Sequence, residues 1–302
     1  MFKNSFVAGL SLVILHSVAA AADGQPQAKL SAEEIVGKNA AARGGLEAWR
    51  AVQTMTLSGK LGAGGNQRAT LNVPSTNVPA PRGRGASVNA MVAPRPVDEV
   101  QLPFVMELKR PRKMRFELQF SGQTAVQVFD GLNGWKLRPY LNRRMVEPYT
   151  ADEMKQASAQ ADLDGPLMDY QAKGTKVELA GAEKVEGRDT YKIKLTKKNG
   201  ETQHVWIDAG TFLETKIEGQ PRVLDGVAHP VEVYFRDYRA VSGLQIPFVL
   251  ETKVLSVGKT VMGLKDPAVP PEKVVIDRVV VNPQLADSLF AKPEVEVAST
   301  SR

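Results

Sequence analysis

Residues 102–128 read LPFVMELKRPRKMRFELQFSGQTAVQV, and this stretch decides the fold. Large apolar residues alternate here with polar ones at a period of two, in three segments separated by turn-forming residues. The apolar positions are Phe104, Met106 and Leu108, then Met114, Phe116, Leu118 and Phe120, and finally Val126 and Val128. Such alternation is typical of antiparallel strands that have one apolar face. The pattern predicts consecutive hairpins whose apolar side must be covered.

Turn signals continue this arrangement along the chain. Arg110-Pro111-Arg112 and Ser121-Gly122 separate the three segments, and Asn199-Gly200 and Ser242-Gly243 predict later hairpins. Residues 151–170 lose the alternation and look helical, with a break near Gly165-Pro166. With roughly ten strands, we expect a mainly β fold with some α: a strongly curved antiparallel sheet, or incomplete β-barrel, with helices covering its concave face.

The first folded element is a helix that begins near Ala32. Ser31 and Glu34 have the spacing of a capping box, and Gly44-Gly45 should break the helix into two pieces. Trp49 lies on the apolar stripe of the second piece. A large aromatic residue at such a position is normally buried, so we expect Trp49 to anchor the core.

The N-terminal region indicates export. Residues 1–22 combine Lys3, an apolar stretch from Phe6 to Leu15 and small residues before Asp23, which is the pattern of a cleavable secretory signal peptide. By length, the remainder, 23–302, is one large domain or two small ones, and we expect a single domain. A Pro/Gly-rich segment at about 61–97 reads as a loop insertion between two strands; its alternative roles are a solvated excursion, a flap over the sheet or a docking arm.

Composition narrows the class of protein. The 302-residue chain has a formal net charge of +6 and no cysteine, so neither a disulfide framework nor a lipid-modified N-terminal cysteine is possible. The positive charges are dispersed, which argues against nucleic acid as a partner. Because the chain has no disulfides, a hydrophobic core must supply its stability. The positive net charge fits an anionic membrane surface or an acidic partner better than nucleic acid.

Signals for catalysis are weak. His204 and His229 are not at metal-ligand spacing, no serine lies in a nucleophile elbow, and Asp162-Leu163-Asp164-Gly165 has too few ligands for a calcium loop. We expect His204 to be a strand histidine satisfied by a neighbour. The sequence predicts no catalytic residues, no metal site and no cofactor.

One turn is strongly basic. Lys109, Arg110, Arg112 and Lys113 surround Pro111 at a predicted hairpin tip. These residues are candidates for contact with phospholipid headgroups or with an acidic partner. The alternative is an ordinary solvated turn.

Several short sequence motifs resemble those of one protein family. They are Arg43-Gly44-Gly45-Leu46-Glu47-Ala48-Trp49, Lys109–Arg115, Phe129-Asp130-Gly131 followed by Gly134-Trp135, Gly243-Leu244-Gln245-Ile246-Pro247, and Val281-Asn282-Pro283 with Phe290 and Pro293. Together they resemble the outer-membrane lipoprotein-sorting protein family, the periplasmic LolA/LolB-like superfamily. The resemblance implies an incomplete β-barrel whose apolar concave face shelters acyl chains in the periplasm of a Gram-negative-type envelope.

These observations favour a non-enzymatic periplasmic carrier for a lipoprotein acyl chain or another lipid. It is expected to be a monomer that docks with an inner- or outer-membrane protein. The expected cavity residues are Phe104, Met106, Met114, Phe116, Leu118, Phe120, Val126 and Val128. An envelope sensor that binds a partner protein through the same fold is the alternative, and a hydrolase that depends on scattered carboxylates is less favoured.

Overall fold

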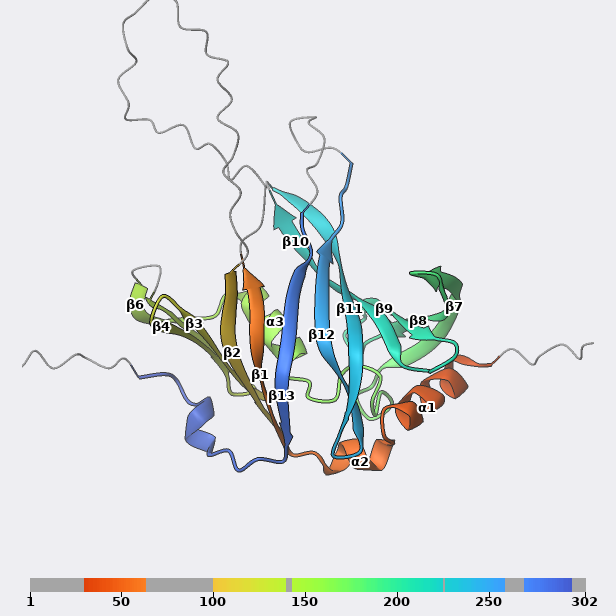
Figure 1. Ribbon diagram of the computed structural model, residues 1–302, viewed down its shortest axis with the longest axis horizontal. Coiled ribbons are helices and arrows are strands. Elements are labelled where there is room, and N and C mark those ends of the chain that lie inside the picture. Colours follow the sequence, from red (N-terminus) through yellow and green to blue (C-terminus); the bar gives the residue numbers. More distant parts are fainter. Residues whose placement is uncertain (1–29, 64–99, 140–142, 225, 259–268, 295–302) are drawn as a thin grey trace, which may run out of the picture. The chain divides into compact units, whose positions relative to one another are not determined.

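A computed structural model describes residues 30–63, 100–139, 143–224, 226–258 and 269–294 (Figure 1). The described residues from Ser31 onwards belong to one compact unit, to which the description below is confined. The predicted signal peptide, and the predicted insertion beyond Ala63, lie outside the described residues.

The main element is one antiparallel sheet of thirteen strands, counted over the described residues. Its order is β6-β5-β4-β3-β2-β1-β13-β12-β11-β10-β9-β8-β7, so the first and last strands lie side by side in its interior (Figure 1). The strands are β1 (Thr54–Ala63), β2 (Val100–Lys109), β3 (Lys113–Phe120), β4 (Gln123–Phe129), β5 (Gly134–Arg138), β6 (Arg143–Pro148), β7 (Lys176–Val185), β8 (Arg188–Thr196), β9 (Thr202–Asp208), β10 (Glu214–Leu224), β11 (Val227–Val241), β12 (Leu244–Val254) and β13 (Glu272–Val281). Because β6 and β7 do not pair, the sheet stays open. The predicted fold class, an incomplete β-barrel with helices, is confirmed.

The predicted hairpins form where the turn residues place them. Phe120 pairs with Gln123 across Ser121-Gly122, and Val241 pairs with Leu244 across Ser242-Gly243. Both serines have φ near 50°, in the left-handed region that two-residue hairpin turns require. Local turn chemistry thus sets the register of these strands.

The helices begin and end at the predicted signals. α1 (Ala32–Ala42) has a complete capping box between Ser31 and Glu34, and α2 (Leu46–Ala51) follows Gly44-Gly45. Gly44 has φ 112°, and a Cβ there would lie 2.4 Å from the backbone oxygen of Gly243. The backbone oxygen of Arg43 also accepts a hydrogen bond from the Gln245 amide at 3.0 Å. Glycine therefore lets the break between the helices rest directly on the β11–β12 turn.

A third helix, α3 (Ala151–Gln160), and a short 3₁₀ helix, η2 (Asp287–Phe290), complete the fold. α3 has its own capping box, formed by Thr150 and Glu153. Over the described residues, no helix has the length and apolar character needed to cross a membrane.

Candidate functional site

The sheet has an inner face that packs against the helices. Cross-strand pairs on this face include Phe104 with Leu118, Met106 with Phe116, and Leu108 with Met114. The core that covers them contains Trp49 of α2 and Ala157 of α3, together with Ala161 and Met168. Trp49 is 2% exposed, as the sequence predicted for a core anchor.

The structure places the eight predicted cavity residues on two different faces. Phe104, Met106, Met114, Phe116, Leu118 and Phe120 share the inner face, because their cross-strand partners continue in register. Val126 and Val128 pair with Glu117 and Arg115 instead, so they lie on the opposite, outer face. The expectation of one continuous wall across β2, β3 and β4 was wrong for these two valines.

The outer-face valines belong to a separate small core. Val126 and Val128 pack with Phe290 of η2 and with four partly buried residues, Trp135, Leu137, Leu285 and Leu289. The segment after β13 therefore covers an apolar patch on the outer face. Arg115 helps to hold it, since its Nη1 donates to the backbone oxygen of Leu289 at 3.2 Å.

On the inner face, the end of the sheet next to α2 is closed. Met114 is 1% exposed, and Leu108, Met55 and Phe129 are also buried there. Farther along the strands, a set of apolar side chains packs against this core but stays only partly buried; we call it the inner strip, and it comprises Leu57, Leu61, Met106, Phe116, Leu118, Leu250 and Val274. It crosses β3, β2, β1, β13 and β12. Phe104 lies buried among these residues and stacks on Phe116, with ring centroids 5.7 Å apart.

Residues 150–175 contain α3 and the turns that follow it, and we call them the cover. The helix buries only Ala157 among its ten residues. Its first turn is tied to the sheet by Lys136 of β5, whose Nζ lies 2.6 and 2.5 Å from the two carboxylate oxygens of Glu153. Burial disfavours the charged form of Glu153, but the hydrogen bonds from Lys136 and Thr150 outweigh it and hold the pKa of this carboxyl below its ordinary value.

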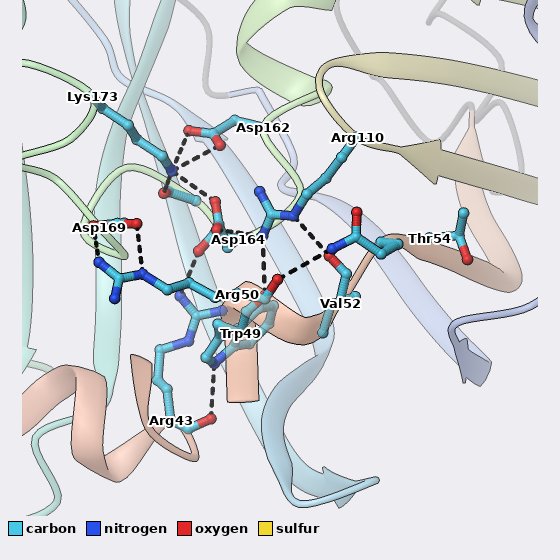
Figure 2. A network of polar contacts seen from close by, with 12 residues as sticks. Arg43, Trp49, Arg50, Val52, Thr54, Arg110, Asp162, Asp164, Asp169 and Lys173 are labelled. Carbon is cyan, nitrogen blue, oxygen red and sulfur yellow. Dashed lines mark hydrogen bonds and ion pairs between the residues drawn. The ribbon is translucent and has the colours of Figure 1, made fainter. Parts of the chain in front are cut away.

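The second half of the cover is held by a network of charges (Figure 2). Asp164 is at its centre and is 2% exposed. Its carboxylate accepts hydrogen bonds from Arg110 Nη2 and Lys173 Nζ, both at 2.7 Å, and its backbone oxygen accepts one from Arg43 Nη1 at 3.1 Å. Arg43 also pairs with Glu214 at 3.1 Å. The network thus joins the cover to the α1–α2 junction, the β2–β3 turn and β10.

Two neighbouring carboxyls in this network respond in opposite directions. Burial disfavours ionisation of Asp164, yet the hydrogen bonds from Lys173 and Arg110 prevail, so its pKa lies below its ordinary value. Burial raises the pKa of Asp162 despite its contact with Lys173 at 2.8 Å. Of these two carboxyls, Asp164 is therefore the one whose surroundings favour the charged form.

The basic turn is only partly available to a partner. Arg110 points into the network and also donates to the backbone oxygens of Trp49 and Val52 (Figure 2). Lys109 and Lys113 pair with Asp287 of η2 at 3.2 and 2.7 Å. Arg112 is exposed. Three of the four residues thus have structural contacts, and their contact with a membrane or partner stays a prediction.

The histidines make local contacts. His204 Nδ1 lies 2.9 Å from both carboxylate oxygens of Glu218, which confirms the expectation of a strand histidine with a neighbouring partner. His229 is buried, with Nδ1 3.0 Å from the backbone oxygen of Leu255. Across the residues that the structure describes, no group of three or more His, Cys, Asp or Glu side chains is arranged to hold a metal ion.

Comparison with known proteins bears on the fold. No protein-family model and no curated protein matches the chain. Among solved structures, it is similar to a DUF1329 family protein from Desulfovibrio piger, with a TM-score of 0.50, 11% identity and coverage of 86% of this chain and 97% of that one. This likeness shows a shared fold.

Two further solved structures are similar to the chain. One is a LolA superfamily protein from Nitrosomonas europaea, with a TM-score of 0.49, 12% identity and coverage of 87% of this chain and 98% of that one. The other is described as a domain of an outer membrane lipoprotein-sorting protein from Vibrio parahaemolyticus, with a TM-score of 0.47, 11% identity and coverage of 86% and 95%.

Proposed function

We propose that this chain is an exported, non-enzymatic binding or carrier protein that shelters the acyl chain of a lipid or a lipoprotein on the inner strip. The observation that carries the proposal is the contrast along the inner face. Next to α2 the face is closed by a buried core, whereas the inner strip keeps seven apolar side chains only partly buried across five neighbouring strands. A continuous apolar surface of this kind is typical of a site for an apolar ligand.

The strip can bind a chain without special chemistry. Each CH₂ removed from water contributes about 0.8 kcal/mol. A micromolar complex needs about 8 kcal/mol net, and association costs at least about 4 kcal/mol in lost freedom. An acyl chain must therefore bury roughly fifteen CH₂ groups, or fewer where the strip is preorganised, which is the length range of membrane lipids.

The cover is suited to controlling access. α3 buries a single alanine, and ion pairs hold the cover at both ends: Lys136 with Glu153 at the first turn, and Arg110 and Lys173 with Asp164 beyond it. Such contacts have a defined geometry but bury little apolar surface. Beyond α3 the cover buries Ala161, Leu167 and Met168 and stays packed. We therefore propose that movement of α3 alone admits the acyl chain beside Phe116 and Met106.

Uptake of a fluorescent fatty-acyl probe tests the proposal. Phe116→Asp places a carboxylate within the strip, and we expect probe affinity to fall by about tenfold or more, because a charge beside an acyl chain must be desolvated. The matched control is Val105→Asp, which places the same charge on the outer face of the adjacent strand, opposite Glu117. Circular dichroism checks whether both variants fold.

The result that would contradict the proposal is equal uptake by Phe116→Asp and Val105→Asp, or no uptake by the parent protein. Should Phe116→Asp fail to fold, Met106→Gln provides a milder change on the same rung of the sheet. Native mass spectrometry of protein from a periplasmic extract, followed by organic extraction, would show whether lipid co-purifies with a single copy of the chain.

A further inference from the structure

Two cations border the inner strip on β5. Lys136 pairs with Gln127 of β4, and Gln127 pairs with Phe116 of the strip. Alternation along β5 places Arg138 on the same face as Lys136, whereas Trp135 and Leu137 face the outer core. Arg138 lies farther from the β4–β5 turn, towards the part of the inner face where the strip remains partly buried. The apolar strip thus has a cationic border.

The two cations differ in how fully their hydrogen bonds are used. Lys136 is satisfied by both carboxylate oxygens of Glu153. Arg138 makes one contact, from Nη2 to Glu147 Oε2 at 3.1 Å, and its side chain is 25% exposed. Its Nε–H is buried and has no hydrogen-bond partner in the described part of the chain. An unpaired buried N–H is costly, so this group favours an acceptor.

We infer that Arg138 binds the anionic headgroup of an amphiphile whose chain lies on the inner strip. The inference rests on the proposed function and names its ligand class: a single apolar chain with a carboxylate or phosphate head. The Nε and Nη2 groups of arginine lie on one edge of the guanidinium plane and suit two anionic oxygens. Only Nη2 is engaged, by one oxygen of Glu147.

The spacing fits this ligand. Adjacent strands lie about 4.8 Å apart, so Arg138 on β5 is about 10 Å from Leu118 on β3, two strands away. The arginine side chain and the first carbons of an acyl chain together span that distance. Ala125 on the intervening β4 pairs with Leu118 and is a small, buried residue.

The local charges leave Arg138 able to take an anion. Glu153 is paired with Lys136 through two short contacts. Within the described residues, Glu147 is the carboxylate paired with Arg138. A bound headgroup would share Arg138 with Glu147, and it would reach the buried Nε–H when the groups that cover this atom move. A ligand with a neutral head can accept a hydrogen bond here, but it lacks the attraction between opposite charges that strengthens this contact.

Three twelve-carbon ligands separate the headgroup from the chain: dodecanoate, dodecyl phosphate and dodecanol. Their affinities are measured at pH 7 by displacement of a fluorescent fatty-acyl probe. We expect the parent protein to bind one or both anions at least about tenfold more tightly than dodecanol. Arg138→Gln should lose that preference and keep its affinity for dodecanol, and Arg138→Lys should retain an intermediate preference. Arg115→Gln, on the outer face, is the matched control and should behave as the parent.

The outcomes distinguish the two proposals. Equal binding of all three ligands by the parent, or a preference that survives in Arg138→Gln, overturns the headgroup assignment while the carrier function stands. Failure of all three ligands and the probe to bind overturns the proposed function as well. A preference for dodecanoate over dodecyl phosphate, or the reverse, identifies which anion the site takes.

Discussion

Asp164→Asn is expected to loosen the cover, because this carboxylate binds Lys173 within the cover and Arg110 of the β2–β3 turn. Its side chain is 3% exposed and lies 2.7 Å from both Arg110 and Lys173, which are 27% and 26% exposed. Removing one partner of a buried ion pair costs about 3–5 kcal/mol, whereas exposed pairs contribute about 0–1 kcal/mol. Since both cations remain partly hydrated, we expect a loss near the lower limit, about 3 kcal/mol.

Asp169→Asn is the matched control within the same cover. Asp169 pairs with Arg50 at 2.9 Å, but its side chain is 25% exposed and that of Arg50 is 47% exposed. The same chemical change should therefore have little effect there. Urea unfolding measures the free-energy change of each variant, and hydrogen exchange shows whether amides of residues 150–175 exchange faster in Asp164→Asn while those of β8 and β9 do not. A loss below about 1 kcal/mol for Asp164→Asn, or equal losses in the two variants, would refute the reasoning.

Two further predictions concern the outer face. Val128→Ala should destabilise the protein by roughly 2 kcal/mol, because Val128 is 0% exposed in the small core with Phe290. Acyl-probe uptake should be unchanged. A large loss of uptake by a folded variant would show that Val128 contacts the ligand. Glu186, hydrogen-bonded by Arg236, has its pKa lowered from 4.5 to about 2, so its contribution to stability is present above pH 4.5 and is lost as the pH falls towards 2. Acid titration of unfolding should therefore show a shallower decline between these values in Glu186→Gln than in the parent, and identical slopes would show that the pair does not contribute.

Local signals predicted the secondary structure well because they act over a few residues. The Ser31–Glu34 capping box begins α1, and the turn at Ser121-Gly122 joins β3 to β4 as expected. The fold also explains some of the sequence motifs that resemble the family. Gly44 packs on the backbone of Gly243, so two motifs that are far apart in the sequence form one contact.

The charge network could not be predicted in the same way. Arg110 and Asp164 are 54 residues apart, and Arg43 and Glu214 are 171 residues apart. In the sequence, Arg110 belongs to a basic turn that looks like a solvated or membrane-facing tip, and Asp164 belongs to an acidic tetrapeptide that looks like a helix cap or turn. Only the folding of the cover against α2 and β10 brings these opposite charges together. Their pairing depends on tertiary structure, which composition and periodicity do not specify.

The error at Val126 and Val128 has a different origin, since the sequence contains the information that corrects it. A two-residue turn at Ser121-Gly122 pairs Phe120 with Gln123, so every even-numbered residue of β3 faces an odd-numbered residue of β4. The inner face of β4 is therefore formed by Ala125, Gln127 and Phe129, and its two valines must face outwards. Apolar residues on both sides of β4 in turn require a second cover, which the segment ending in Phe290 supplies. The same pairing places the small Ala125 and the polar Gln127 between the inner strip and the cations of β5, Lys136 and Arg138. From β3 to β5, the inner face therefore changes from apolar to cationic. Such a change from apolar to cationic side chains is what a site for an amphiphile would require.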